Sequence, residues 1–217
     1  MRKKYMYLAS GLLFVSFIIV TLIVRTDSLR SFDFNTTVRI QNHTPRMLDP
    51  FLSYFSFFGS FEVTITILIL FALLIRKYFF LSLSIVLFGI SHLFELVGKN
   101  FLLQPAPPFL FHRTYSLFLF PSSYVQTNGS YPSGHSMRSI FLLVIIFLFL
   151  WYSKIQGLKR KVLFILIGVV AFLMLYSRVS LGEHWITDVI GGSLLGASSA
   201  LFVFAYHRKN NRKITHA

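Results

Sequence analysis

The chain has 217 residues, the length of a single domain (1–217), and its composition of 55% hydrophobic and 13% charged residues excludes an ordinary soluble globule and predicts membrane spans. Its 21 Lys and Arg against 7 Asp and Glu make it strongly basic, but these residues flank apolar runs, which favours contact with lipid headgroups over nucleic acid. No Cys is present, which excludes disulfides, thiolate metal sites and cysteine nucleophiles.

Six apolar stretches predict an all-α, polytopic membrane protein whose six transmembrane helices form a bundle. Their expected bounds are Tyr5–Val24, Phe51–Ile75, Tyr78–Leu96, Ser136–Tyr152, Val162–Tyr176 and Trp185–Tyr206. The fourth and fifth are shorter than the roughly 20 residues that a span needs, so we expect both to extend into flanking residues. The first begins as a signal peptide would, but no small-residue cleavage site follows Val24, so we expect a retained anchor. A short interfacial helix is expected in the polar connector Arg25–Pro50.

The charged residues between the stretches predict the orientation. With a cytoplasmic N-terminus, 13 of the 21 Lys and Arg fall on the cytoplasmic side: Arg2, Lys3, Lys4, Arg76, Lys77, Lys154, Lys159, Arg160, Lys161, Arg208, Lys209, Arg212 and Lys213. The positive-inside rule therefore predicts that both termini are cytoplasmic. Residues 97–135 and 177–184 then share the outer side, where we expect the active site to face.

Ionisable residues close the third stretch. Glu95 and Lys99 are four residues apart with the acid first, which favours an ion pair on one helix face. We expect Glu95 to neutralise Lys99 while the lysine points toward a bound phosphate. The alternative is a helix-end pair with Lys99 reaching the headgroups. His92 and Glu62 are interpreted as hydrogen-bonding groups between helices rather than as catalysts.

Residues 105–131 are rich in Pro, Ser and aromatic residues. Their aromatic side chains are expected to form a lid in the headgroup region, or else the general interfacial belt that such residues more often make. The residues concerned are Phe109, Phe111, Tyr115, Phe118, Phe120 and Tyr124.

The first motif, Pro132-Ser133-Gly134-His135, directly precedes the fourth stretch. Ser133 is suited to cap the following helix, and Gly134 lets the backbone approach a ligand closely. Free N–H groups at a helix start bind anions, and His135 in the first turn is placed to protonate a leaving oxygen. The alternative is an ordinary turn and cap with an incidental His.

The second motif is Ser177-Arg178, followed by His184 and Asp188. On a helix, His184 and Asp188 lie on one face, so that the carboxylate accepts one imidazole N–H and leaves the other nitrogen free to attack. Arg178, just beyond the fifth stretch, is suited to bidentate binding of phosphate oxygens. Alternatively, His184 and Asp188 merely satisfy each other and Arg178 reaches the headgroups.

In order and spacing these residues resemble the three-part motif of the type 2 phosphatidate phosphatase superfamily, which bacterial acid phosphatases and vanadium haloperoxidases share. Its pattern is Lys, six residues, Arg-Pro; then Pro-Ser-Gly-His; then Ser-Arg, five residues, His, three residues, Asp. The second and third parts match completely, and six spans match the integral membrane branch. The resemblance implies that His184 forms a phosphohistidine, that Asp188 orients it and that His135 protonates the leaving group. It also implies no metal or cofactor, and phosphoryl oxygens held by Lys99, Ser133, Gly134 and Arg178.

The chain does not match the first part of the pattern, because Ala106-Pro107 stands where the family has Arg-Pro. Loss of one such cation costs about 2.7–4 kcal/mol of transition-state stabilisation. Our hypothesis is a relocated cation: Arg138 lies three residues after His135 and shares its helix face. Arg113 is the second candidate. The alternative for Arg138 is that it reaches the outer headgroups. The alternative for Arg113 is a solvated loop charge, and for this residue it is the favoured interpretation.

The sequence thus predicts a phosphatase of a lipid phosphate or diphosphate at the outer membrane face, with membrane lipids and no nucleic acid as partners. By family analogy, the candidate substrates are undecaprenyl diphosphate, phosphatidylglycerol phosphate and phosphatidate. Two alternatives stay open: a non-catalytic lipid-phosphate binder, because of Ala106, and a phosphotransferase that passes the phosphoryl group from His184 to another lipid. The sequence leaves the oligomeric state open.

Overall fold

All regular secondary structure is helical in the residues that this computed structural model describes, which are 3–76, 78–102, 104–115, 118, 120–124 and 127–214, without the side chains of 124 and 208–214. The α-helices are α1 (Lys3–Arg25), α2 (Arg30–His43), α3 (Asp49–Ser56), α4 (Phe61–Leu74), α5 (Tyr78–Phe101), α6 (Gly134–Trp151), α7 (Gly157–Ser180) and α8 (Ile186–Ile214). Short 3-10 turns are η1 (Arg46–Leu48), η2 (Phe57–Gly59), η3 (Phe109–Phe111) and η4 (Pro121–Tyr124). The predicted all-α class is confirmed.

Among the described residues, five helices are long and apolar enough to cross a membrane: α1, α5, α6, α7 and α8 as far as His207. The second predicted stretch, Phe51–Ile75, is not one continuous helix, because the segment Arg46–Gly59 is bent by 55° from α4. Counting this bent pair as one span gives the six that the sequence predicts. The bend has a local cause, since Ser60 is extended (ψ 155°) and the Gly59 carbonyl accepts a hydrogen bond from Arg138 Nε (3.0 Å).

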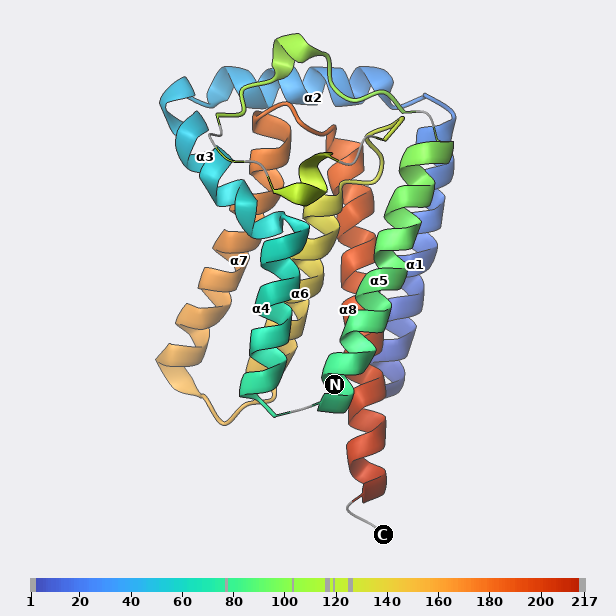
Figure 1. Cartoon of the computed structure of the whole chain (residues 1–217), viewed down its shortest axis with the longest axis vertical. Helices are drawn as coiled ribbons and strands as arrows, with labels where there is room; N and C mark the ends of the chain where they lie inside the picture. Colours follow the sequence, from blue (N-terminus) through green and yellow to red (C-terminus); the bar gives the residue numbers. More distant parts are fainter. Residues whose placement is uncertain are drawn as a thin grey trace.

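The short stretches extend as expected. The fifth begins at Gly157 and ends at Ser180, beyond both predicted ends, and the fourth begins at Gly134. The helix expected in the connector is α2, which lies across one end of the bundle (Figure 1). It covers the end where the two motifs lie.

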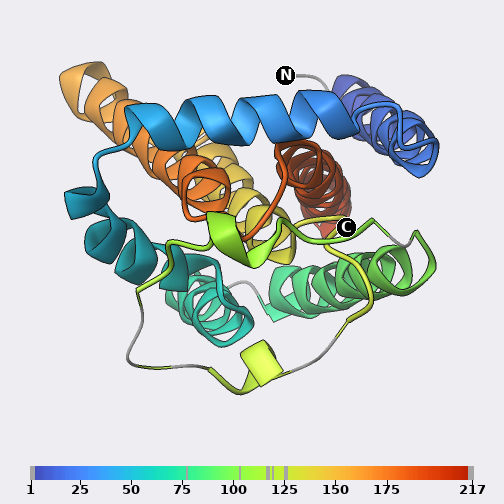
Figure 2. The same cartoon turned by 90° about the horizontal axis from the view of Figure 1, so that it is seen from above.

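Helix α8 lies at the centre, packed against α1, α5 and α6 (Figure 2). Its closest approach to α6 depends on two glycines. A Cβ at Gly192 would overlap the carbonyl oxygen of Ser133, and one at Gly196 would overlap that of Met137. Because neither glycine has a side chain, the starts of α6 and α8 can meet, and with them the two motifs.

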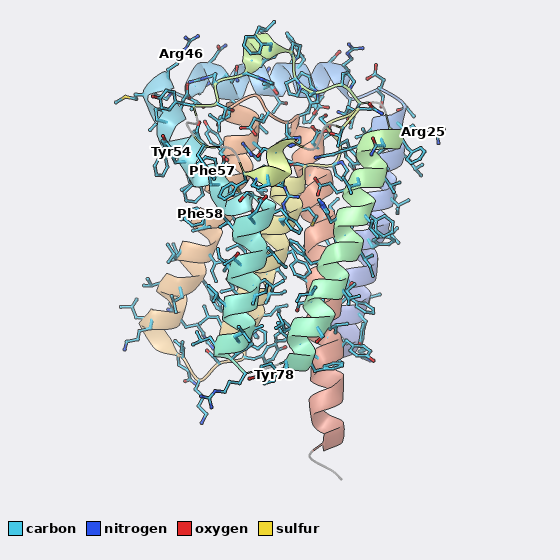
Figure 3. The ribbon with its side chains drawn as sticks, in the orientation of Figure 1. Arg25, Arg46, Tyr54, Phe57, Phe58 and Tyr78 are labelled. Carbon is cyan, nitrogen blue, oxygen red and sulfur yellow. The ribbon has the colours of Figure 1, made fainter. Side chains whose placement is uncertain are left out.

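The two ends of the bundle differ. Figure 3 shows Arg25 and Arg46 at the α2 end and Tyr78 at the opposite end, where α1 begins and α8 ends (Figure 1). Residues 97–102 and 177–184 lie together at the α2 end, as the alternation of spans predicts. That this end faces outside stays a prediction. Arg2, Lys77 and the side chains of the basic tail beyond His207 lie outside the described residues.

The described part of the segment 104–131 runs across the α2 end of the bundle (Figure 2). Phe111 is buried and packs edge-on against Trp185. Phe120 lines a cavity of about 510 Å³ at this end of the bundle. Phe109, by contrast, is 87% exposed. The predicted aromatic lid therefore forms only in part, and the side chain of Tyr124 lies outside the described residues.

Candidate active site

A cavity of about 510 Å³ opens where α5, α6, α7 and the loop before α8 meet. Five predicted site residues line it: Lys99, His135, Arg138, Arg178 and His184. The backbone N–H of Ser133 donates to the carbonyl of Asp188 (2.9 Å), which fastens the first motif to the second. In the part of the chain that the structure describes, no group of three or more His, Asp or Glu side chains is placed to hold a metal ion.

His184 and Asp188 form the predicted pair, with Nδ1 and Oδ2 3.2 Å apart. The prediction that both lie on a helix is wrong, because α8 begins at Ile186 and His184 lies in the preceding turn. The same Asp188 oxygen accepts the backbone N–H of Trp185 (3.0 Å), and this bond holds the turn against the helix start. Asp188 is fully buried, and His184 Nε2 has no hydrogen-bond partner among the described residues.

The first motif starts α6 as predicted. Ser133 is the N-cap, and its hydroxyl accepts the N–H of Ser136 (3.4 Å). His135 stands in the first turn and faces the cavity. Ser133 and Gly134 are buried and do not line the cavity, since the space above Gly134 is filled by the Glu95 carboxylate. Their roles in binding phosphate stay predictions.

Glu95 is buried among three basic side chains. Lys99 Nζ lies 2.9 Å from Oε1, and Arg138 Nη1 and His92 Nδ1 lie 2.9 and 2.8 Å from Oε2. The predicted pairing of Glu95 with Lys99 is therefore present. The prediction of a bond between helices is wrong for His92, because its partner is on the same helix.

Glu62, likewise interpreted as a hydrogen-bonding group between helices, accepts hydrogen bonds from Ser122 of the 3-10 turn η4, from its N–H (2.7 Å) and its hydroxyl (2.9 Å).

Arg138 does not reach the headgroups. It is 6% exposed and is held by Glu95 and by the Gly59 carbonyl, and it lines the cavity from the side of α6. The geometry is compatible with a relocated cation, although one edge of its guanidinium is committed to Glu95.

Arg178 is fully buried in the last turn of α7. Its Nη2 lies 2.7 Å from Glu183 Oε1, but without the geometry of a hydrogen bond. Nε, Nη1 and Nη2 are all buried with no hydrogen-bond partner among the described residues. The sequence did not predict Glu183 as a site residue, because its only signal was an acidic residue directly before His184.

The favoured interpretation of Arg113 as a solvated loop charge is wrong. Its side chain is 10% exposed and bonds to Asp49 (Nε to Oδ2, 2.9 Å) and to the carbonyls of Gln41 (3.0 Å) and Thr44 (2.9 Å). It does not line the cavity. Arg113 therefore ties the loop to α2 and α3 and is no replacement for the missing cation.

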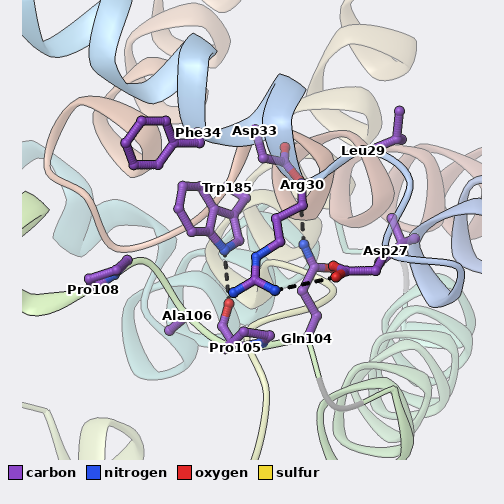
Figure 4. Close-up of a pocket in the computed structure, with 11 residues that line it drawn as sticks. Asp27, Leu29, Arg30, Asp33, Phe34, Gln104, Pro105, Ala106, Pro108 and Trp185 are labelled. Atoms are coloured by element: carbon purple, nitrogen blue, oxygen red, sulfur yellow. Dashed lines mark hydrogen bonds and ion pairs between the residues drawn. The ribbon is translucent and has the colours of Figure 1, made fainter.

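Ala106, at the position of the motif's arginine, lines a different pocket of about 290 Å³ beneath the start of α2 (Figure 4). Its neighbours there include Arg30, Pro105 and Trp185, whose indole N–H donates to the Pro105 carbonyl (2.8 Å). The backbone thus presents this position away from the cavity that holds the histidines.

A family model for the PAP2 superfamily matches residues 77–212, which include every residue of the two motifs and Lys99. The chain belongs to the PAP2 superfamily. This confirms the resemblance read from the motifs. Phosphatidylglycerophosphatase B of Bacillus subtilis (strain 168) is 32% identical over 133 residues, which cover 60% of this chain and 59% of that relative.

Two solved structures share this fold. A transmembrane PAP2 type phosphatidylglycerolphosphate phosphatase from Bacillus subtilis superposes with a TM-score of 0.74 at 24% identity, over 92% of this chain and 96% of that one. Aquifex aeolicus LpxE gives 0.59 at 23% identity, over 79% and 93%. With its apolar helices, this PAP2 member is an integral membrane protein.

The cavity of this PAP2 member combines three kinds of group. A histidine oriented by a buried aspartate offers a free ring nitrogen, a second histidine, His135, lines the same cavity, and Lys99, Arg138 and Arg178 supply positive charge. Such a set suits transfer of a phosphoryl group to a nitrogen nucleophile.

Proposed function

We propose that this protein hydrolyses a lipid phosphate or diphosphate through a phosphohistidine on His184. The observation that carries the proposal is the bond of His184 to buried Asp188 (3.2 Å) beside His135 and three cations in one cavity. The names of its relatives make phosphatidylglycerol phosphate the first substrate to test, followed by phosphatidate and undecaprenyl diphosphate.

In the first step, Nε2 of His184 attacks phosphorus and the bond from phosphorus to the leaving oxygen breaks. Asp188 holds the N–H at Nδ1 and stabilises the positive charge that the ring gains. Protonated His135 gives its proton to the leaving oxygen, so the lipid departs as a neutral alcohol or as a lipid phosphate.

In the second step, water attacks the phosphohistidine, the phosphorus–nitrogen bond breaks, and His135 takes the proton from the water. Lys99, Arg138 and Arg178, with the hydroxyl of Ser133 and the backbone N–H of Gly134, hold the phosphoryl oxygens. Arg138 stands in for the arginine that Ala106 replaces. No metal enters these steps.

The active site is proposed to face outside, with both termini in the cytoplasm. The uneven distribution of Lys and Arg supports this orientation. A lipid can then reach the cavity from the outer leaflet.

The test is release of inorganic phosphate by the purified protein from the three lipids in detergent, beside His184→Ala. His184-dependent release from at least one lipid is expected, with an acid-labile, base-stable phosphoenzyme in a rapid quench. Binding of the lipids without release would instead establish the binder that Ala106 suggests. Phosphate found on a second lipid rather than in water would establish a phosphotransferase.

A further inference from the structure

The guanidinium of Arg178 is a buried charge with an incomplete set of partners. Its three nitrogens are enclosed and lack hydrogen bonds in the described structure, and only Nη2 touches a counter-charge. A buried cation in this state is costly unless an anion neutralises it. In this structure that anion is Glu183.

Glu183 lines the same cavity as His135 and His184. Its Oε1 also accepts a hydrogen bond from the Thr114 hydroxyl (2.7 Å), which belongs to the loop over the cavity. Burial opposes ionisation of Glu183, but the charge of Arg178 and the Thr114 hydrogen bond lower its pKa below the ordinary value. Glu183 is therefore negatively charged at neutral pH.

Glu183 lies beside Nη2 of Arg178, the nitrogen that matters most for binding an oxyanion. A guanidinium binds an oxyanion bidentately either through Nε and Nη2 or through Nη1 and Nη2, and both pairs include Nη2. A carboxylate 2.7 Å from Nη2 therefore competes with a phosphoryl group at the nitrogen that both ways of binding share. It also places a negative charge beside the incoming one.

We propose that Glu183 competes with phosphate for Arg178. The substrate's phosphoryl group displaces the Glu183 carboxylate from Nη2, and the carboxylate returns after hydrolysis to expel inorganic phosphate. The inference rests on the proposed function, because it takes Arg178 as a ligand of the phosphoryl group. It assigns Glu183 a part in product release and predicts weak product inhibition in the natural chain.

The test uses inorganic phosphate as the probe and measures its dissociation constant from the rise in thermal stability of the detergent-solubilised full chain. Glu183→Gln is expected to bind phosphate about tenfold more tightly, the change for one charge-assisted contact. Thr114→Val, at an exposed position, loosens Glu183 and is expected to tighten binding about two- to threefold. Asp27→Asn removes an acid at the same end that does not line the cavity, and should change nothing.

Unchanged or weaker phosphate binding by Glu183→Gln would overturn the proposal, since it would make Glu183 a support of Arg178 rather than its competitor. If that variant does not fold, weaker binding by Thr114→Val decides against the proposal in the same way. Because binding is measured without turnover, its outcome is separate from that of the lipid phosphatase assay.

Discussion

The two buried arginines that line the cavity differ in the partners of their guanidinium groups. Arg138 is fastened by Glu95 and by the Gly59 carbonyl, whereas Arg178 meets only Glu183. Arg138 is therefore fixed before substrate arrives, and Arg178 has free donors for it. A fixed cation costs no reorganisation during the reaction, which is the property required of a replacement for the motif's arginine.

Replacing Arg138 tests this role. Arg138→Ala is expected to lower kcat/KM for phosphate release by about 10²–10³, because a cation that stabilises the transition state is lost. Arg113→Ala is the matched control: it should lower the midpoint of thermal unfolding, since it breaks the ties to Asp49, Gln41 and Thr44, while the folded protein keeps its activity. Equal and mild losses of activity in both variants would contradict relocation to Arg138.

The residues that line the cavity could be predicted from the sequence where they belong to a motif of fixed spacing. Lys99, His135, Arg178 and His184 line the cavity as the two motifs and the third stretch predicted. The partner of Arg178, Glu183, and the structural use of Arg113 were not predictable, because each depends on a loop conformation. A charge in an irregular segment has no periodicity from which its neighbours can be inferred.

At the scale of elements, α2 supports the start of α8. Asp33 of α2 accepts the Thr187 N–H (3.1 Å) and the Thr187 hydroxyl (2.7 Å), one residue from Asp188. Burial raises the pKa of Asp33 from 3.8 to about 6, a rise that the Thr187 hydrogen bonds oppose and the charge of Asp188 assists.

This shift predicts a pH dependence of stability. Between about pH 3.8 and 6 the folded state holds the Asp33 proton and the unfolded chain does not, so this group's contribution to stability falls as pH rises through that window. In Asp33→Asn the group no longer titrates. The difference in unfolding midpoint, Asn variant minus natural chain, is therefore expected to increase from pH 4 to pH 6 and to level off above it. Parallel pH profiles for the two proteins would contradict the assignment.

The contact of α6 with α8 predicts a second element-scale effect. Gly192→Ala places a methyl group against the Ser133 carbonyl, and is expected to cost about 1–3 kcal/mol of stability and to separate His135 from His184. Gly168→Ala in α7 is the control, because no atom beyond its chain neighbours and the backbone of its own helix lies within 4 Å of the added methyl group. It should be neutral or slightly stabilising. Thermal unfolding and phosphate release of the two variants decide between crowding and a general effect of Gly-to-Ala substitution.

For the whole molecule, the orientation can be tested with single thiols, because the chain has no Cys. Met47, near the end of α2, is 84% exposed, and Leu158, at the opposite end, is 75% exposed. In intact cells a membrane-impermeant maleimide is expected to label Met47→Cys, and to label Leu158→Cys only after permeabilisation. The reverse pattern would place the cavity on the cytoplasmic side.

The sequence by itself determined the helical class, the approximate spans and two of the three parts of the motif. Apolar runs of spanning length and fixed motif spacings are local properties, and each leaves a signal in the residues themselves. The tertiary structure alone decided the bend between α3 and α4, the start of α8 after His184, and the enclosure of Arg138 by Glu95 and Gly59. These depend on which polar groups meet when distant helices pack, because a buried donor or acceptor must take whatever partner the neighbouring helix presents.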